Sequence, residues 1–228
     1  MSMVTVPVPV GARGIDSEPW SHNADAPHAH ALYASGVELV FLYLGAVTAA
    51  SIANVLAAGL GFVPVTYASA IDAPGAGATT VAQLHALGIP HGCCVFLDIE
   101  GAGTLADPAG LIMRVNAWCD VVASAGYVPG VYIGSPQPLT TEELTGLHAV
   151  RYWRAPARVV DRHGALAEPA AGWCAYQAWP SRDWAGVWVD VDFCFQDFKG
   201  RTIMMCATDP ARATTDPAPP APETPETD

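Results

Sequence analysis

The stretch Val95-Phe96-Leu97-Asp98-Ile99-Glu100 is an apolar, strand-like segment that ends in two carboxylates and runs into Gly101-Ala102-Gly103. Residues two apart on a β-strand point to the same side, so the Asp98 and Glu100 side chains are expected to project together at the strand's carboxyl end. Burial and like charge disfavour two ionised acids, so one of them tends to keep its proton. A protonated acid beside a carboxylate is the pair that cleaves glycosidic bonds. The alternative is that both acids are solvated or cap the next helix.

Strand-like and helical segments alternate on both sides of this stretch. The pattern predicts eight strands, at residues 13–16, 38–44, 62–67, 93–99, 127–133, 149–154, 173–178 and 186–193. It predicts five helices, at 25–35, 48–58, 79–87, 107–125 and 140–147, with glycines or capping residues at several of their ends. Residues 156–171 and 179–185 show no helical period, so we expect loops between the last three strands.

This alternation predicts an α/β fold with a mostly parallel sheet. Eight strands in a chain of this length favour a single (β/α)8 TIM-like barrel, partly degenerate in its last three strands, over an open doubly wound sheet. No dinucleotide-binding fingerprint or phosphate-binding glycine loop supports the open sheet. We place the barrel at 13–206, after an extended lead-in at 1–12 and before a disordered tail at 207–228 that is rich in Pro, Thr and acids.

The composition argues against several classes of function. The 228 residues are 51% hydrophobic and 14% charged, which is sufficient for one sizeable core. The net charge is −12 and the few basic residues are scattered, so we expect no nucleic-acid binding. No apolar run reaches membrane-spanning length, and no secretory signal pattern opens the chain. We expect a soluble protein made in the cytoplasm, which reaches an external substrate by export without a signal peptide or in a phage-associated setting.

The cysteines and histidines form no recognisable reactive or metal-binding motif. The six cysteines lack C-x-x-C spacing, and the adjacent Cys93 and Cys94 do not indicate a disulfide framework. The seven histidines include no H-x-x-x-H pair, and there is no G-x-S-x-G nucleophile motif. We expect mostly reduced core cysteines, no metal and no cofactor.

Acids and aromatic residues occur at the predicted carboxyl ends of the strands, which form the active face of such a barrel. The acids, from the first, fourth and eighth strands, are Asp16, Asp98, Glu100, Asp190 and Asp192. The other strand-end residues are Tyr43, Tyr67, Tyr132, Trp153, Tyr176 and Gln177. Because aromatic faces pack on sugar C–H groups and carboxylates bind hydroxyls, this set predicts a sugar-binding groove. Taken singly, Tyr43 and Trp153 fit core packing better, and Asp16 fits a helix N-cap equally well.

These segments resemble the glycoside hydrolase family 25 type of lysozyme. They are still more similar to the related glycoside hydrolase-like domains of the domain-of-unknown-function 1906 family. The matching segments, in order along residues 13–198, are Gly14-Ile15-Asp16, Val95-Phe96-Leu97-Asp98-Ile99-Glu100, Gly130-Val131-Tyr132-Ile133, Tyr152-Trp153-Arg154-Ala155, Tyr176-Gln177-Ala178-Trp179 and Val189-Asp190-Val191-Asp192. Six segments in this order cover nearly the whole predicted barrel.

The resemblance implies a barrel that cleaves the β-1,4 bond of peptidoglycan between N-acetylmuramic acid and N-acetylglucosamine. Carried over by position, Glu100 is expected to be the general acid, and Asp98 to orient the 2-acetamido group or stabilise the oxocarbenium-like centre. Asp16 and Asp190 are expected to line the −1 subsite and to keep Glu100 protonated by like-charge repulsion. The residues expected to bind the substrate are Tyr43, Tyr67, Tyr132, Trp153, Gln177 and Asp192.

The chain departs from the lysozyme pattern after the second and third strands. Leu42-Tyr43-Leu44-Gly45-Ala46 lacks a further acid, and residues 68–74 replace an aromatic-rich loop. The leading hypothesis is a glycoside hydrolase acting on a cell-wall polysaccharide of the peptidoglycan type. One alternative is an inactive barrel that binds glycan or serves as a structural or virion module. Another is a metal-dependent hydrolase using the same acids, which the histidine pattern does not favour. The sequence does not predict the oligomeric state.

Overall fold

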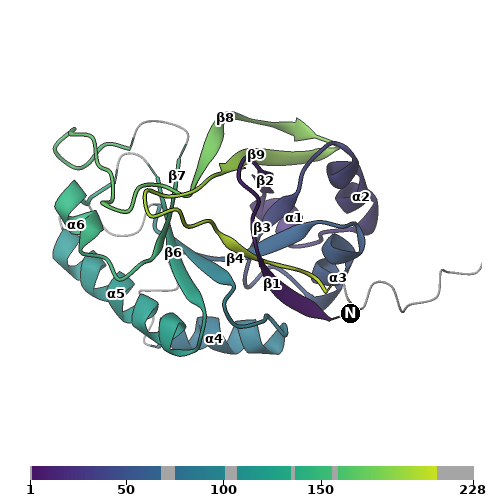
Figure 1. Cartoon of the computed structure of the whole chain (residues 1–228), viewed down its shortest axis with the longest axis horizontal. Helices are drawn as coiled ribbons and strands as arrows, with labels where there is room; N and C mark the ends of the chain where they lie inside the picture. The colour runs from purple at the N-terminus through teal and green to yellow at the C-terminus, as the bar shows by residue number, and fades with distance from the viewer. Residues whose placement is uncertain (1, 68–74, 101–106, 135–136, 156–158, 210–228) are drawn as a thin grey trace, which may run out of the picture.

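Figure 1 shows the protein as a computed structural model. The structure describes residues 2–67, 75–100, 107–134, 137–155 and 159–209. The predicted tail beyond residue 209, the glycine-rich segment after Glu100 and the altered loop at 68–74 lie outside the described residues.

Eight strands close into a barrel with helices around it (Figure 1). Their order is β4-β3-β2-β9-β8-β7-β6-β5, and β5 pairs back with β4. The strands are β2 Arg13–Asp16, β3 Leu39–Tyr43, β4 Gly61–Tyr67, β5 Cys94–Asp98, β6 Val128–Ile133, β7 Arg151–Arg154, β8 Ala175–Trp184 and β9 Val187–Cys194. The predicted TIM-like α/β barrel is therefore confirmed.

The last two strands differ from the prediction. Strands β2 to β8 form parallel pairs, whereas β9 is antiparallel to both β2 and β8. The loop predicted at 179–185 is wrong, because β8 continues to Trp184 and forms a hairpin with β9. Ala185 and Gly186 make its turn with φ values of 54° and 83°, a conformation that matches the twist of paired strands. Pro180 argues against a strand here when the sequence is considered alone, because proline rarely occurs inside a hydrogen-bonded pair of strands.

The helices lie outside the barrel (Figure 1), and all of the described ones except that at Ala76–Ala86 begin at a capping side chain. The predicted five are α2 Ala26–Ala34, α3 Ala49–Ala57, α4 Ala76–Ala86, α5 Pro108–Ser124 and α6 Thr141–Thr145. A further short helix, α1 Glu18–Ser21, follows β2 and was not predicted. Its N-cap is Ser17, whose side chain accepts the Trp20 N–H, so Asp16 is not the cap and its carboxylate can face the barrel mouth.

Two terminal strands lie against the barrel. Strand β1, Met3–Pro7, pairs antiparallel with β10, Met204–Thr208, and β10 contacts β4 where Cys206 lies opposite Phe62. The sequence showed no pattern for this pair beyond an extended lead-in. Strand β10 runs across the predicted boundary between residues 206 and 207.

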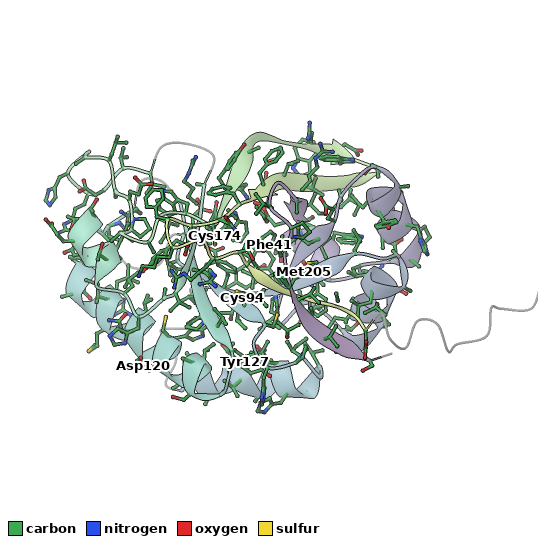
Figure 2. All side chains as sticks on the ribbon, in the orientation of Figure 1. Phe41, Cys94, Asp120, Tyr127, Cys174 and Met205 are labelled. Atoms are coloured by element: carbon green, nitrogen blue, oxygen red, sulfur yellow. The ribbon has the colours of Figure 1, made fainter. Side chains whose placement is uncertain are left out.

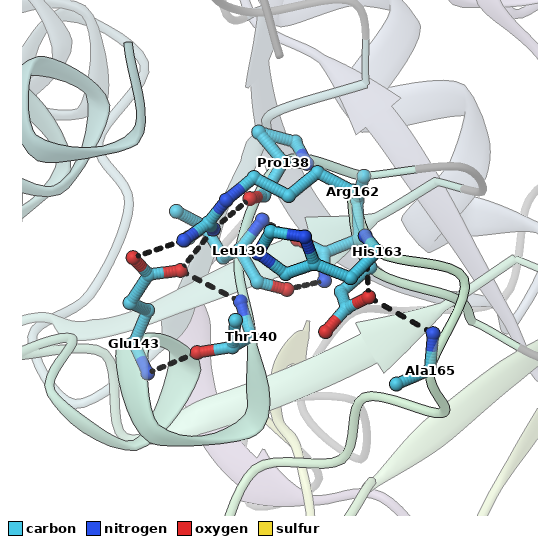
Figure 3. A network of polar contacts seen from close by, with 9 residues as sticks. Pro138, Leu139, Thr140, Glu143, Arg162, His163 and Ala165 are labelled. Atoms are coloured by element: carbon cyan, nitrogen blue, oxygen red, sulfur yellow. Dashed lines mark hydrogen bonds and ion pairs between the residues drawn. The ribbon is translucent and has the colours of Figure 1, made fainter. Parts of the chain in front are cut away.

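The chain between β7 and β8 has no helix over its described residues and is held instead by polar contacts (Figure 3). Thr140 and Glu143 form a capping box at the start of α6. The guanidinium of Arg162 forms a two-point ion pair with Glu143, with 2.9 Å between Nη2 and Oε1. Asp161 accepts backbone N–H groups of His163 and Ala165. These contacts fix the segment to α6 where a barrel helix would otherwise pack.

Apolar side chains fill the barrel interior and also the layer between the strands and the surrounding helices. Along β3, Val40 and Leu42 face the helices, whereas Leu39, Phe41 and Tyr43 face the interior. The interior layer below the mouth contains Phe41 stacked on Trp153, with 4.3 Å between ring centroids. Figure 2 shows Phe41, Cys94 and Cys174 within the ring of strands. All six cysteines are free and buried. The filled interior gives the barrel mouth a rigid floor.

Candidate active site

Four acids meet at the barrel mouth. Asp16 is the last residue of β2 and Asp98 the last residue of β5, with Glu100 two residues further on. Asp190 lies directly opposite Asp16 in the pairing of β2 with β9. The prediction that Asp190 ends a strand is wrong, because β9 runs in the opposite direction and Asp190 lies in its middle. The strand pairing nevertheless brings it to the same rim.

Burial and neighbouring charges raise the pKa of three of these acids. Burial, together with the charges of Asp190 and Asp98 and against the hydrogen bond from Gln177, raises the pKa of Asp16 to about 7. Burial, together with the charge of Glu100, raises the pKa of Asp98 to about 7. Burial and then the charge of Asp190 raise the pKa of Glu100. The site therefore holds several acids that keep protons close to neutral pH.

Glu100 orients Asp98 through its backbone, and its own side chain lies over a glycine that follows the next strand. The backbone N–H of Glu100 donates to Asp98 Oδ1 at 2.8 Å, which orients the Asp98 carboxylate. A Cβ atom on Gly134, directly after β6, would lie 2.5 Å from Glu100 Oε1. Only glycine at position 134 therefore leaves room for Glu100 in this conformation. Gly134 was not predicted, because its role depends on how the Glu100 side chain lies.

A chain of hydrogen bonds supports Asp16 from below. The Tyr132 hydroxyl donates to Gln177 Oε1 at 2.8 Å, and Gln177 Nε2 donates to Asp16 Oδ2 at 2.9 Å. The first bond fixes the amide so that its N–H groups face Asp16. Both residues were predicted at the rim, and the structure brings them together with Asp16.

Trp153 and Asp192 lie one layer deeper than predicted for substrate-binding residues. Both side chains have no exposed surface, and Trp153 Nε1 donates to Asp192 Oδ1 at 2.8 Å. Asp192 lies opposite Gly14, one step below the pair of Asp16 and Asp190. In this structure they support the site from beneath rather than line its open surface.

Two tyrosines form an aromatic wall beside Asp98. Tyr43 and Tyr67 stack with 4.7 Å between ring centroids, and Tyr67 is the neighbour of Asp98 in the pairing of β4 with β5. Tyr67 is 37% exposed and Tyr43 is buried. Tyr67 also forms a side-chain hydrogen bond with Glu18 of α1, a partner that was not predicted. The exposed ring gives a sugar a surface on which to pack.

Tyr176 does not belong to this site. It precedes Gln177 on β8 and so points to the other side of the sheet, where it stacks on Phe193 and lies under the Arg154 guanidinium. Neither Tyr176 nor Gln177 ends its strand, since β8 continues to Trp184.

Within the described ranges, no three His, Cys, Asp or Glu side chains lie together in a way that could hold a metal ion. The same part of the chain contains no helix long and apolar enough to cross a membrane.

Comparison with known proteins connects this barrel to one family. The family profile described as "Rv2525c-like, glycoside hydrolase-like domain" matches residues 29–199 of the 228. A search of curated protein sequences finds no significant match.

Several solved structures share the fold at low sequence identity. An uncharacterized protein of B. stearothermophilus has 18% identity and a TM-score of 0.57, covering 81% of this chain and 96% of its own. The catalytic domain of endolysin ply40, from bacteriophage P40 of Listeria monocytogenes, has 15% identity and a TM-score of 0.50, with coverages of 81% and 93%. GHIP, described as a glycosyl hydrolase 25 of Streptococcus pneumoniae, has 11% identity and a TM-score of 0.54, with coverages of 80% and 86%.

Proposed function

The chain belongs to the Rv2525c-like family of glycoside hydrolase-like domains, and from this premise we propose that it cleaves a cell-wall polysaccharide by carboxylate acid catalysis. The observation that carries the proposal is the meeting of Asp16, Asp98, Glu100 and Asp190 at one barrel mouth, where burial and neighbouring acid charges raise the pKa of Asp16, Asp98 and Glu100. Such clustering of like charges costs stability, and a site for acid catalysis is a reason to keep it.

In this proposal Glu100 is the general acid. It is the most exposed of the four acids, so the oxygen of a bound glycosidic bond can reach it. Burial and the charge of Asp190 raise its pKa, which keeps a proton available for the leaving oxygen. A bound glycan would displace water from the mouth and raise the pKa further.

The deeper acids would stabilise the positive charge that develops on the sugar. Asp98 is held by the Glu100 backbone N–H, so its carboxylate has a defined direction in the mouth. Asp16 and Asp190 add negative charge from the opposite side of the barrel. A carboxylate beside an oxocarbenium-like centre lowers the energy of the transition state, and it can also orient a 2-acetamido group.

Two considerations support a cell-wall glycan of the peptidoglycan type as the substrate class. Tyr67 presents a partly exposed ring next to Asp98, which suits the C–H face of a sugar. An endolysin catalytic domain and a glycosyl hydrolase 25 share the fold.

The test is the release of new reducing ends from purified peptidoglycan, measured beside co-sedimentation of the protein with the same material. The proposal predicts release that rises with time and with enzyme concentration. Co-sedimentation without release would contradict it and favour the inactive glycan-binding barrel. Release that stops with a chelator would favour the metal-dependent alternative.

A further inference from the structure

Asp192 is the most deeply buried acid of the described chain. Its side chain has no exposed surface, and it lies on the interior face of β9, two residues after Asp190. An isolated carboxylate at such a position is strongly disfavoured, because it has lost its hydration. The residue must therefore be neutralised or receive several hydrogen bonds.

The hydrogen bonds around Asp192 have defined directions. The indole N–H of Trp153 can only donate, so Asp192 Oδ1 accepts it at 2.8 Å. Among the described N–H and O–H donors, none reaches Asp192 Oδ2. Asp192 also forms a side-chain hydrogen bond with the Asp16 carboxyl, which lies diagonally across the pairing of β2 with β9. One of the two acids must supply the proton for that bond.

The surroundings favour the proton on Asp192. Asp16 accepts a 2.9 Å bond from Gln177 Nε2 at its other oxygen, and that amide is oriented by the Tyr132 hydroxyl. With the proton on Asp192, Asp16 receives two donors as a carboxylate, whereas Asp192 accepts from Trp153 and donates to Asp16. The reverse assignment also gives the carboxylate two donors, the Trp153 indole and the Asp16 O–H, but it places the anion at Asp192, which is more deeply buried than Asp16. Burial and the Asp16 charge also raise the pKa of Asp192 well above its usual range.

The groups that face the pair come from several strands. The titratable ones are Asp190 and Cys194 on β9, Asp98 on β5, Tyr43 on β3 and Tyr132 on β6. Trp153 on β7 and Gln177 on β8 contribute neutral donors. Since the nearest acids add only negative charge, they too favour one retained proton in the pair.

We propose that Asp192 is a neutral carboxylic acid in the folded protein and that its proton holds Asp16 as an oriented carboxylate at the floor of the site. Asp192 is then a positioning residue, which acts through Asp16 and does not touch the glycan. The protonation state does not depend on the proposed function, whereas its effect on turnover rests on that function.

Infrared spectroscopy tests the protonation state without any substrate. The carbonyl stretch of a protonated carboxyl is recorded well above neutral pH, where Asp98, with a pKa of about 7, has lost its proton. We expect this band in the wild type, in Asp16→Asn and in the surface control Glu168→Gln, and its loss in Asp192→Asn. No band in the wild type, or a band that persists in Asp192→Asn, would overturn the proposal.

Turnover adds a second readout. In Asp192→Asn the amide can donate to Asp16 and accept from Trp153, so turnover of cell-wall glycan is expected to stay within about threefold of the wild type. Asp192→Leu removes the donor, and we expect a loss of about tenfold or more, with the ionisation of Asp16 moved to higher pH. Equal losses in both variants, with melting curves showing both folded, would contradict the positioning role. If the wild type releases no sugar, the proposed function fails while the infrared result still decides the protonation state.

Discussion

The Glu100 carboxylate lies over Gly134, where a single added methyl group would stand 2.5 Å from Oε1. The contact joins the acid that follows β5 to the residue that follows β6, so two neighbouring strands define where the acid lies. The added methyl group would also stand 2.7 Å from Glu100 Cγ, so the whole side chain must turn to another rotamer, and because Glu100 is exposed this turn costs the fold little. The position of the acid, however, would change.

Gly134→Ala is therefore expected to lower kcat by about 10–100-fold while changing the melting temperature little. The matched control is Gly146→Ala at the end of α6, where the nearest atom to an added Cβ is a backbone oxygen at 3.4 Å. Steady-state kinetics on peptidoglycan and thermal unfolding of both variants make the comparison. Unchanged turnover in Gly134→Ala would show that the present position of Glu100 is not needed.

The buried acids predict how stability depends on pH. The pKa of Asp98 is about 7 in the folded protein and about 4 in an unfolded chain, so between these values the folded state binds more protons. The contribution of Asp98 is thus fully present below about pH 4 and is lost as the pH rises through 7. Asp98→Asn has no ionisable carboxyl group at this position, so it lacks this pH-dependent loss of stability. Its free energy of unfolding at neutral pH is expected to exceed that of the wild type by about 1–3 kcal/mol. Urea unfolding between about pH 4 and pH 7 measures the difference in free energy of unfolding between the variant and the wild type. A difference that shrinks as the pH rises would contradict the raised pKa of Asp98.

The Tyr132 hydroxyl is expected to matter through Gln177. Tyr132→Phe removes the bond that orients the Gln177 amide, so Asp16 loses a fixed donor and kcat/KM is expected to fall about 3–10-fold. Tyr152→Phe is the control, because its buried hydroxyl bonds the Leu144 carbonyl outside the barrel interior. Similar kinetics for the two variants would mean that Gln177 is positioned by other contacts.

Tyr67 is expected to contribute to glycan binding and not to bond cleavage. Tyr67→Ala removes the exposed ring beside Asp98, and we expect KM to rise about 3–10-fold with kcat nearly unchanged. Tyr33→Ala on α2 removes a ring that is 52% exposed away from the mouth and serves as the control. A fall in kcat with unchanged KM would instead assign Tyr67 a part in the chemical step.

Much of the fold was predictable because each element carries its own local signal. The alternation of apolar runs with capped helices predicted all eight barrel strands and the five longer helices. The direction of β9 was not predictable in this way, since a hairpin and a crossover leave the same strand pattern in the sequence. The continuation of β8 was concealed by Pro180, and β10 lacks an alternating pattern because it packs against the barrel edge.

The acids of the site were predictable from the sequence, but how deeply each site residue lies in the barrel was not. The spacing of Asp98 and Glu100 and the strand-end position of Asp16 follow from the two-residue period of a strand. Whether a residue lines the mouth or supports it from beneath depends on the stagger between neighbouring strands, which no single segment encodes. Trp153 and Asp192 were therefore expected at the open surface of the mouth, whereas both are fully buried, and Gly134 was not predicted.

The most direct test of the acid-catalysis account compares Glu100→Gln with the wild type and with Glu168→Gln, which removes an exposed acid in the segment between β7 and β8. Reducing ends released from purified peptidoglycan are measured for the three proteins at equal folded concentration. We expect release to fall by a factor of about 100 or more in Glu100→Gln and to be unchanged in Glu168→Gln. Equal release by all three proteins would contradict the role of Glu100 as the general acid.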